Sequence, residues 1–342
     1  MNALTKTIVL GALAICISLN GREAFAETTV DQAVQIVETP KVTQKPLEQK
    51  DDKGVKKYYV SGEYQYSYIG PGKGIRLEGF RDGSYLEQAK EIALPSELDG
   101  YPVRRIANNV FAMNSYVERL VIPDSIEVIG DKSFMMCRAL KSVHIGKNVR
   151  KIQNDAFYMC DQLEKVTGGE SVQIIEMRVF QYCKKLHSEP FMGTKHKINM
   201  GDSAYSNTAM KKIRLSKRIV LACSLFRGCK QLCSADLSQV SDMEYTEYLF
   251  RDCVSLKKVK LSNKCRYIDK GMFYNCRRLT TVNIPNRVKW IEAKAFKNCK
   301  KLKKLRIPGS VKSIAKNAFD GCKNLTLYVK KGSYAERYAK KN

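Results

Sequence analysis

The sequence predicts an α/β solenoid of 23-residue coils, with a parallel β-sheet on one face and a capping unit at each end. Phenylalanines recur every 23 or 24 residues, with one gap of 46 between positions 180 and 226. Cysteines follow them three residues later. Self-similarity at a fixed interval of this length is typical of solenoids, in which each repeat is one supersecondary unit. The recurring phenylalanines are Phe111, Phe134, Phe157, Phe180, Phe226, Phe250, Phe273, Phe296 and Phe319.

Each repeat carries the spacing Leu-x-x-Val-x-Ile after its cysteine, as in Leu279, Val282 and Ile284. The alternation of Val and Ile predicts a short strand with both side chains on one face. The second half of the repeat, with Val288 and Ile291, predicts a tight turn and a short helical or extended return. One such coil cannot enclose a core by itself, so the coils are expected to stack.

The repeat Ile-Pro-x-x-Val-x-x-Ile-x-x-x-Ala-Phe-x-x-Cys-x-x-Leu resembles the BspA-type leucine-rich repeat of bacterial surface and secreted proteins. The resemblance covers about residues 58–342. Gly74–Phe111 resembles the N-terminal capping unit of that family, and Leu325–Asn342 resembles its C-terminal cap. The resemblance implies a single elongated solenoid that acts as an adhesin or another binding protein and not as an enzyme.

Five segments follow from these patterns. Residues 1–26 predict a secretory signal peptide, because a lysine precedes a short apolar run and Ala24-Phe25-Ala26 forms a cleavage site. Residues 27–57 contain no aromatic residue and predict a flexible leader. Residues 58–110 form the N-terminal capping unit, 111–325 the coils, and 326–342 the C-terminal cap. We therefore expect a secreted chain, monomeric and without a membrane segment after cleavage, that can associate with a bacterial cell surface.

The coils around residues 187–209 depart from the pattern. Gly168 stands where an inward Ile belongs, Lys195 occupies a Val position, and Ser203 replaces the expected Phe. Tyr205 is a candidate substitute for that ring, and Ile213 restores the strand pattern. The break indicates either simple drift with a bulge or a binding site, since irregular loops in repeat proteins are often functional.

The cysteines predict a core feature and not a disulfide framework. Eight of them occupy one position of the repeat inside the apolar pattern, and Cys265 replaces a core Val. A free cysteine packs like a small hydrophobic residue. Cys223 and Cys233 lie off this series and are the better candidates for a disulfide. No Cys-x-x-Cys occurs, and no histidine is close to a cysteine at the spacing of metal ligands. The sequence therefore predicts no metal site.

Motifs for catalysis and cofactors are absent. The sequence contains no G-x-S-x-G, H-E-x-x-H, Walker loop or G-x-G-x-x-G. The glycine-rich segment Gly70–Gly74 precedes a strand-like run, which predicts a turn and not a phosphate-binding loop. We expect neither an enzyme nor a bound cofactor.

Positive charge is concentrated at the C-terminal end. From Arg251 onward, 26 Lys and Arg face 5 Asp and Glu, a net charge of +21 out of +26 for the chain. The strand register directs many of these cations outward, and others lie at the preceding turn, so stacking predicts a basic patch. Its members are Lys211, Lys212, Arg214, Lys257, Lys258, Lys260, Arg277, Arg278, Lys300, Lys301, Lys303, Lys304 and Arg306.

A clustered field of one sign attracts anionic partners, although a solvated face that only keeps the chain soluble is the simpler explanation. The signal peptide argues against nucleic acid. Tyr267 and Trp290, which share one repeat position, are the aromatic side chains that we expect to be exposed. An extracellular protein, an acidic glycan or an anionic cell-wall polymer fits better, which predicts an adhesin. The alternative is a structural envelope component held by charge on the producer's own polymers.

Overall fold

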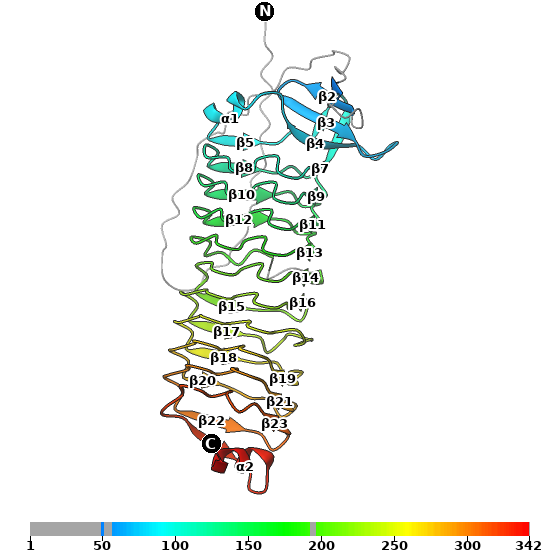
Figure 1. The fold of residues 1–342 in the computed structure, drawn as a ribbon. Coiled ribbons are helices and arrows are strands. Elements are labelled where there is room, and N and C mark those ends of the chain that lie inside the picture. The colour runs from blue at the N-terminus through cyan, green and yellow to red at the C-terminus, as the bar shows by residue number, and fades with distance from the viewer. Residues whose placement is uncertain (1–48, 51–56, 192–195, 342) are drawn as a thin grey trace, which may run out of the picture. The chain divides into compact units, whose positions relative to one another are not determined.

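The computed structural model describes residues 49–50, 57–191 and 196–341. The predicted signal peptide, nearly all of the predicted leader, and Lys195 lie outside these residues. The described chain winds into stacked coils, and most coils contribute short strands to two strand faces (Figure 1). The predicted parallel sheet is therefore confirmed, and the return half of the coil is extended and not helical.

The first strand face comes from the Leu-x-x-Val-x-Ile segments. Its strands pair in parallel, with the apolar residue of each strand buried and its neighbours exposed. They are β5 (Glu91–Ala93), β8 (Arg119–Val121), β10 (Ser142–Ile145), β12 (Lys165–Gly168), β15 (Lys212–Arg214), β17 (Ser234–Asp236), β18 (Lys258–Lys260), β20 (Thr281–Val282), β22 (Lys304–Ile307) and β24 (Thr326–Val329).

The second strand face comes from the return half of each coil. Most of its strands are only two residues long, and they also pair in parallel from coil to coil. They are β7 (Tyr101–Ile106), β9 (Val128–Ile129), β11 (Lys151–Ile152), β13 (Ile174–Ile175), β14 (Ile198–Met200), β16 (Ile219–Val220), β19 (Tyr267–Ile268), β21 (Trp290–Ile291) and β23 (Ser313–Ile314).

The N-terminal capping unit is an antiparallel meander joined to the second strand face. It consists of β1 (Gln49–Lys50), β2 (Lys57–Ser61), β3 (Tyr64–Tyr68), β4 (Ile75–Phe80), the helix α1 (Ser84–Gln88) and β6 (Glu97–Leu98). Strand β4 then pairs in parallel with β7. Strand β1 falls inside the predicted leader and pairs with β2. Gly70–Gly74 forms the predicted turn, in which the Lys73 amide donates to the Gly70 carbonyl at 3.1 Å.

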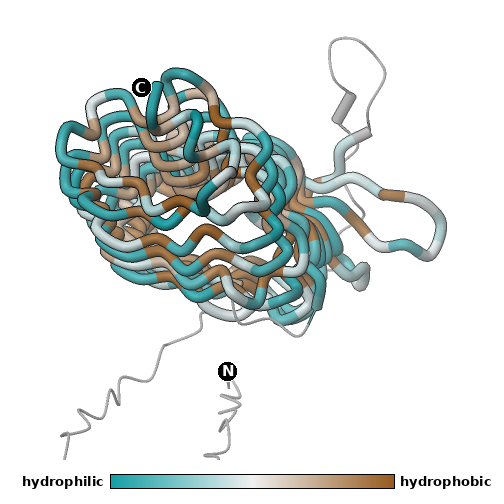
Figure 2. The backbone as a smooth tube through the Cα atoms, turned by 90° about the horizontal axis from the view of Figure 1, so that it is seen from below, coloured by the Kyte–Doolittle hydropathy of each residue, from teal (hydrophilic) through white to brown (hydrophobic). Residues whose placement is uncertain are grey.

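The core between the two faces is a continuous stack of aromatic rings. The recurring phenylalanines lie parallel, with centroids 4.9–6.0 Å apart where two of them are adjacent. Phe80 begins the stack by contacting Phe111 edge-on. Viewed along the stack, hydrophobic and hydrophilic residues alternate along the coils (Figure 2). This alternation places one side chain inside and the next one in water.

Tyr205 replaces the missing phenylalanine in the irregular coil. Its ring stacks 5.4 Å from Phe180 and 6.1 Å from Phe226, and it is fully buried. Its hydroxyl donates to the Pro190 carbonyl at 3.0 Å, which satisfies the polar atom in the core. The sequence-based substitution is confirmed.

The described residues of the irregular coil contribute no strand to the first strand face, which is interrupted between β12 and β15. Phe191 fills the space beside Gly169 and lies 6.4 Å from the ring of Phe180. Gly169 must remain a glycine, because a Cβ there would lie 2.5 Å from the Phe191 ring. A second interruption, in the second strand face, falls between β16 and β19.

The cysteine series forms a ladder of free thiols. Each Sγ donates to the carbonyl oxygen of the ring residue in the preceding coil, at 3.0–3.2 Å. In the irregular coil, Thr208 stands in the ladder and donates to the Tyr205 carbonyl at 3.0 Å. Most of these carbonyls also accept the backbone amide three residues later, as that of Phe134 does from Cys137 at 3.4 Å, so the thiol is a second donor to them.

Cys223 and Cys233, the candidates for a disulfide, are both free thiols. The two residues lie at opposite ends of one turn. Cys223 follows β16 on the second strand face, and its Sγ donates to the Tyr245 carbonyl at 3.4 Å. Cys233 precedes β17 on the first strand face, and its Sγ donates to the Gln231 carbonyl at 3.3 Å.

At the C-terminus, the helix α2 (Tyr334–Lys341) covers the last coil. Ala335 is buried, and the Tyr338 ring lies 6.2 Å from Phe319, edge-on to the aromatic stack. The Tyr338 hydroxyl donates to the Lys316 carbonyl at 3.2 Å. The amphipathic helix therefore ends the stack, as a terminal cap must.

Candidate binding surfaces

The predicted basic side chains lie on the surface in two groups. Nine of them lie on or next to β15, β18 and β22, where they flank the buried Ile213, Val259 and Leu305. We call this group the strand cations. All nine are exposed: Lys211, Lys212, Arg214, Lys257, Lys258, Lys260, Lys303, Lys304 and Arg306.

The remaining four, the turn cations, are exposed at the start of two successive coils. They are Arg277, Arg278, Lys300 and Lys301. The Lys301 amide donates to the Arg277 carbonyl at 3.2 Å, so the two turns are in direct contact. Lys300 and Lys301 begin the coil that carries β22, whereas Arg277 and Arg278 begin the coil of β20, which carries no strand cation.

One acidic residue, Asp236, interrupts the strand cations. Strand β17 places Asp236 opposite Arg214 on one side and Lys260 on the other. Its Oδ2 lies 4.0 Å from the Arg214 Nε. Hydrogen bonds from Ser238, together with Lys260 and Arg214, lower the pKa of Asp236, so it is charged at neutral pH. Sequence reasoning missed this residue, although the coil spacing could have located it.

The other strand cations have no ion-pair partner among the described residues. The N-terminal half of the same face differs in this respect. There Arg119 pairs with Glu91, and the Lys141 Nζ lies 2.7 Å from the Glu118 carboxylate. The Lys141 contact lowers the pKa of Glu118. Positive charge is therefore locally neutralised at the N-terminal end and left free at the C-terminal end.

Tyr267 and Trp290 do not join the basic surface. They occupy opposite positions on β19 and β21, on the second strand face, and their rings stack at 4.6 Å. Both are half-buried, so the expectation that they are exposed holds only in part. Their faces contact each other, which explains the burial. A depression of about 240 Å³ beside Tyr267 also borders Asp242, Glu244 and Arg287.

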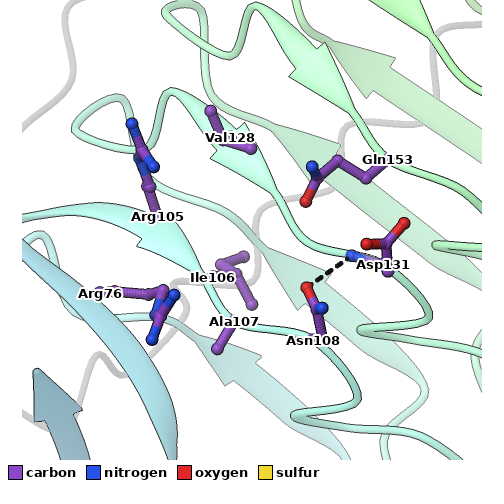
Figure 3. Close-up of a pocket in the computed structure, with 8 residues that line it drawn as sticks. All are labelled: Arg76, Arg105, Ile106, Ala107, Asn108, Val128, Asp131 and Gln153. Carbon is purple, nitrogen blue, oxygen red and sulfur yellow. Dashed lines mark hydrogen bonds between the residues drawn. The ribbon is translucent and has the colours of Figure 1, made fainter. Parts of the chain in front are cut away.

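A second depression lies at the N-terminal end of the second strand face (Figure 3). Arg76 on β4 and Arg105 on β7 are paired in register and border a volume of about 250 Å³. Arg76 is held by Glu78, with 2.6 Å between the Nη2 and Oε1 atoms. Asn108 accepts a hydrogen bond from the Asp131 amide at 3.0 Å. Sequence analysis did not predict this depression, because its residues come from different repeat positions.

An apolar depression lies on the N-terminal meander, beside the Gly70–Gly74 turn. Tyr68 and Tyr101 border it, with their rings 5.0 Å apart and nearly perpendicular. Along the turn cations, another depression of about 550 Å³ includes Arg227, Asp252 and Arg277. These depressions are shallow surface features, and none of them gathers a nucleophile with a base.

Metal and covalent chemistry have no candidate in the described part of the chain. No group of three or more His, Cys, Asp or Glu residues could hold a metal ion there. Burial raises the pKa of most ladder thiols, and that of Cys265 rises to about 12, which leaves them protonated and unreactive. Across residues 49–50, 57–191 and 196–341, no helix is both long and apolar enough to cross a membrane.

Comparison with known proteins assigns the repeat. The family described as the BspA type leucine rich repeat region matches residues 104–233 and 198–326, which together span more than half of the chain. The chain belongs to the BspA-type leucine-rich repeat family. The resemblance seen in the sequence is thereby confirmed, and the solenoid described above is the fold of its BspA-type repeats. No curated protein sequence matches the chain.

Several solved structures of leucine-rich repeat proteins are similar to this BspA-type chain. A leucine-rich repeat protein from Bacteroides ovatus is 22% identical, with a TM-score of 0.44, over 79% of this chain and 88% of that one. A leucine rich cell surface protein from Faecalibacterium prausnitzii is 19% identical, with a TM-score of 0.39, over 84% and 98%. The pneumococcal vaccine antigen PcpA is 17% identical, with a TM-score of 0.46, over 80% and 81%.

Proposed function

We propose that this BspA-type protein is a secreted binding protein, an adhesin, that engages an anionic ligand through the first strand face and the turn cations. Support comes from the family and from the eight strand cations that lack an ion-pair partner among the described residues. Like charges that crowd on one surface repel each other, so a cluster of one sign destabilises the folded chain unless a partner neutralises it.

The single observation that carries the proposal is the asymmetry of charge pairing along one face. On the first strand face, Glu91 and Glu118 pair with Arg119 and Lys141 in the N-terminal coils, whereas among the described residues of the C-terminal coils the acidic partner on this face is Asp236. Solubility alone would be served equally well by mixed charges. An anionic partner is the simplest reason for leaving one end unpaired.

The proposal is tested by binding the chain 27–342 to immobilised extracellular-matrix proteins at physiological salt, with and without a soluble acidic glycan. We expect saturable binding that falls when Lys257, Lys258, Lys303 and Lys304 are all changed to Glu. Undiminished binding by this variant would overturn the role of the strand cations. Binding that survives the glycan would move the site to the irregular coil.

The same cations would also hold the chain on the producer's own anionic envelope polymers, which is the alternative function. Cell fractionation separates the two functions. An envelope component is abundant on the producing cells and is released by high salt, whereas a protein directed at a host ligand accumulates in the medium.

A further inference from the structure

Cations and small polar side chains alternate from coil to coil along the first strand face. In one row, Lys212 lies opposite Ser234, Ser234 opposite Lys258, and Lys258 opposite Thr281. Lys304 holds the same repeat position on the next coil and lies opposite Thr326 on β24. Lysines therefore occupy every second coil, and hydroxyl side chains occupy the coils between them.

The rows on either side follow the same rule. The row before it runs Lys211, Cys233, Lys257, Thr280 and Lys303, joined by backbone hydrogen bonds of 2.8–2.9 Å from Lys211 to Thr280. In the row after it, Arg214, Lys260 and Arg306 are separated by Asp236 and Asn283. Each of β15, β18 and β22 thus carries a band of three cations, and β17 and β20 carry none.

Neighbouring strands in a sheet lie about 4.8 Å apart, so the bands on β15 and β18, which both pair with β17, recur at roughly 9.6 Å. Strand β22 holds the third band two coils further along, although it is not paired with β20. This spacing could simply keep like charges from lying directly opposite each other, which is destabilising. That explanation does not account for the lysines that are adjacent within a band, such as Lys257 and Lys258. The face concentrates charge in bands instead of spreading it.

The row extends into the N-terminal half, but the strands there do not carry bands of three cations. There Arg119, Ser142 and Lys165 lie opposite one another in order, and the Ser188 hydroxyl accepts the Val166 amide beside them. Arg119, however, is already paired with Glu91. Lys165 is exposed and has no ion-pair partner among the described residues, but it stands alone on its strand, whereas bands of three exposed cations begin at Lys211 and Lys212.

We propose that this face binds a linear acidic polysaccharide that lies along the coil stack and carries one acidic group on every second sugar ring. This inference rests on the proposed function. In an extended β-linked chain each ring advances by about one strand spacing, so acidic groups on alternate rings meet successive bands. The intervening rings then place their hydroxyls against Ser234 and Thr281. Duplex nucleic acid, with one phosphate per strand for about every 3.4 Å of helix axis, carries its charges more densely than the bands.

The test compares three soluble polymers of equal length: hyaluronate, with an acid on alternate rings, polygalacturonate, with an acid on every ring, and neutral dextran. We expect hyaluronate to bind the chain 27–342 at least about tenfold more tightly per acidic group than polygalacturonate, and dextran not to bind. A tenfold ratio corresponds to about 1.4 kcal/mol. Lys258→Ser, in the middle band, should weaken hyaluronate binding more than polygalacturonate binding.

The decisive variant fills a gap between bands. Thr280→Lys together with Thr281→Lys, at two exposed positions, makes adjacent coils cationic. The preference should then shift toward polygalacturonate. The control variant, Lys294→Ser with Lys312→Ser, removes two exposed cations that lie outside the first strand face. It should leave the polymer preference unchanged.

Cys233 gives a readout of location that does not depend on affinity. This half-buried thiol lies between Lys211 and Lys257, whereas Cys223 lies near the second strand face. Bound hyaluronate should slow the alkylation of Cys233 and leave that of Cys223 unchanged.

The outcomes separate the two claims. Binding of both acidic polymers in proportion to their charge, unaffected by the filled gap, would overturn the periodic site while leaving the proposed function intact. Failure to bind any anionic polymer or matrix protein would overturn both. Protection of Cys223 in place of Cys233 would place the polysaccharide elsewhere and contradict the inference.

Discussion

Tyr205 preserves the aromatic stack at the coil where the repeat loses its phenylalanine. Its ring bridges Phe180 and Phe226, and its hydroxyl bonds to the Pro190 carbonyl. One residue thus maintains the stacking and also satisfies a carbonyl of the irregular segment. The structure assigns these two contributions to different parts of the side chain, so two substitutions can separate them.

We predict that Tyr205→Ala lowers the free energy of unfolding by about 3–5 kcal/mol, the usual cost of removing a buried aromatic ring. Tyr205→Phe should cost only about 1 kcal/mol, because it keeps the ring and loses one hydrogen bond. Denaturant unfolding followed by circular dichroism measures both values. Equal costs would mean that the hydroxyl, and not the ring, holds the coil.

The buried thiols give the fold a sensitivity to alkaline pH. Burial raises the pKa of Cys160, Cys183, Cys253 and Cys276 above that of a thiol in the unfolded chain, which is about 8.5. Their contribution to stability is complete below that value. It is lost as the pH rises further, because only the unfolded state then releases the protons.

We therefore predict that the melting temperature falls between pH 7.5 and pH 9.5 under reducing conditions. For each pH unit above its unfolded pKa, each buried thiol lowers the free energy of unfolding by up to about 1.4 kcal/mol. Cys276→Ala should lower stability at every pH but flatten the decline, since one titrating group is gone. A decline of the same steepness in this variant would show that the ladder thiols are not its cause.

At the scale of elements, the two strand faces are interrupted at different coils. The first face lacks a strand between β12 and β15, and the second lacks one between β16 and β19. Where one face is interrupted, the other continues through β14 or through β17 and β18. The stack is therefore continuous, although each ladder is not.

The interruption in the second face predicts faster exchange of its backbone amides. Residues 241–245 lack the coil-to-coil backbone hydrogen bonds that the equivalent residues of the next coil, 264–268, make through β19. Hydrogen–deuterium exchange with mass spectrometry should show early labelling of peptides over 241–245 and late labelling over 264–268. Equal protection of the two segments would contradict the observed pairing.

The C-terminal helix protects the open end of the aromatic stack. We predict that Tyr338→Ala lowers the free energy of unfolding by about 2 kcal/mol, less than for a fully buried ring, because Tyr338 is half-buried. Deletion of residues 330–342 should go further and promote self-association through the uncovered coil. Size-exclusion chromatography with light scattering detects this, and Lys340→Ala is the control. A monomeric truncated chain would show that the cap is dispensable.

At the scale of the whole molecule, the period of the sequence predicted most of the architecture. Phe and Cys at fixed intervals located the stack, and Leu-x-x-Val-x-Ile located the first strand face. For the second strand face, the sequence allowed either a short helical or an extended return. Two-residue strands such as Lys151–Ile152 are too short to show an alternation of apolar and polar residues.

The binding surface was predicted less completely than the fold. The cations were located by strand register, whereas Asp236 was missed because its strand carries Ala235 where the other coils have Val, Ile or Leu. The sequence left a Cys223–Cys233 disulfide open, and the two thiols are free because they lie at opposite ends of a turn. The relation between Tyr267 and Trp290 required knowing that their coils place them on the second face.

The central claim is that the strand cations contact the ligand, and the salt dependence of binding tests it most directly. Neutralising anionic groups releases counterions, so the logarithm of affinity falls with the logarithm of salt in proportion to the number of contacts. Changing Lys257, Lys258, Lys303 and Lys304 to Ser should make this slope less steep for an acidic polysaccharide, because the contacts of these four cations are lost. An unchanged slope, with or without weaker binding, would contradict the account.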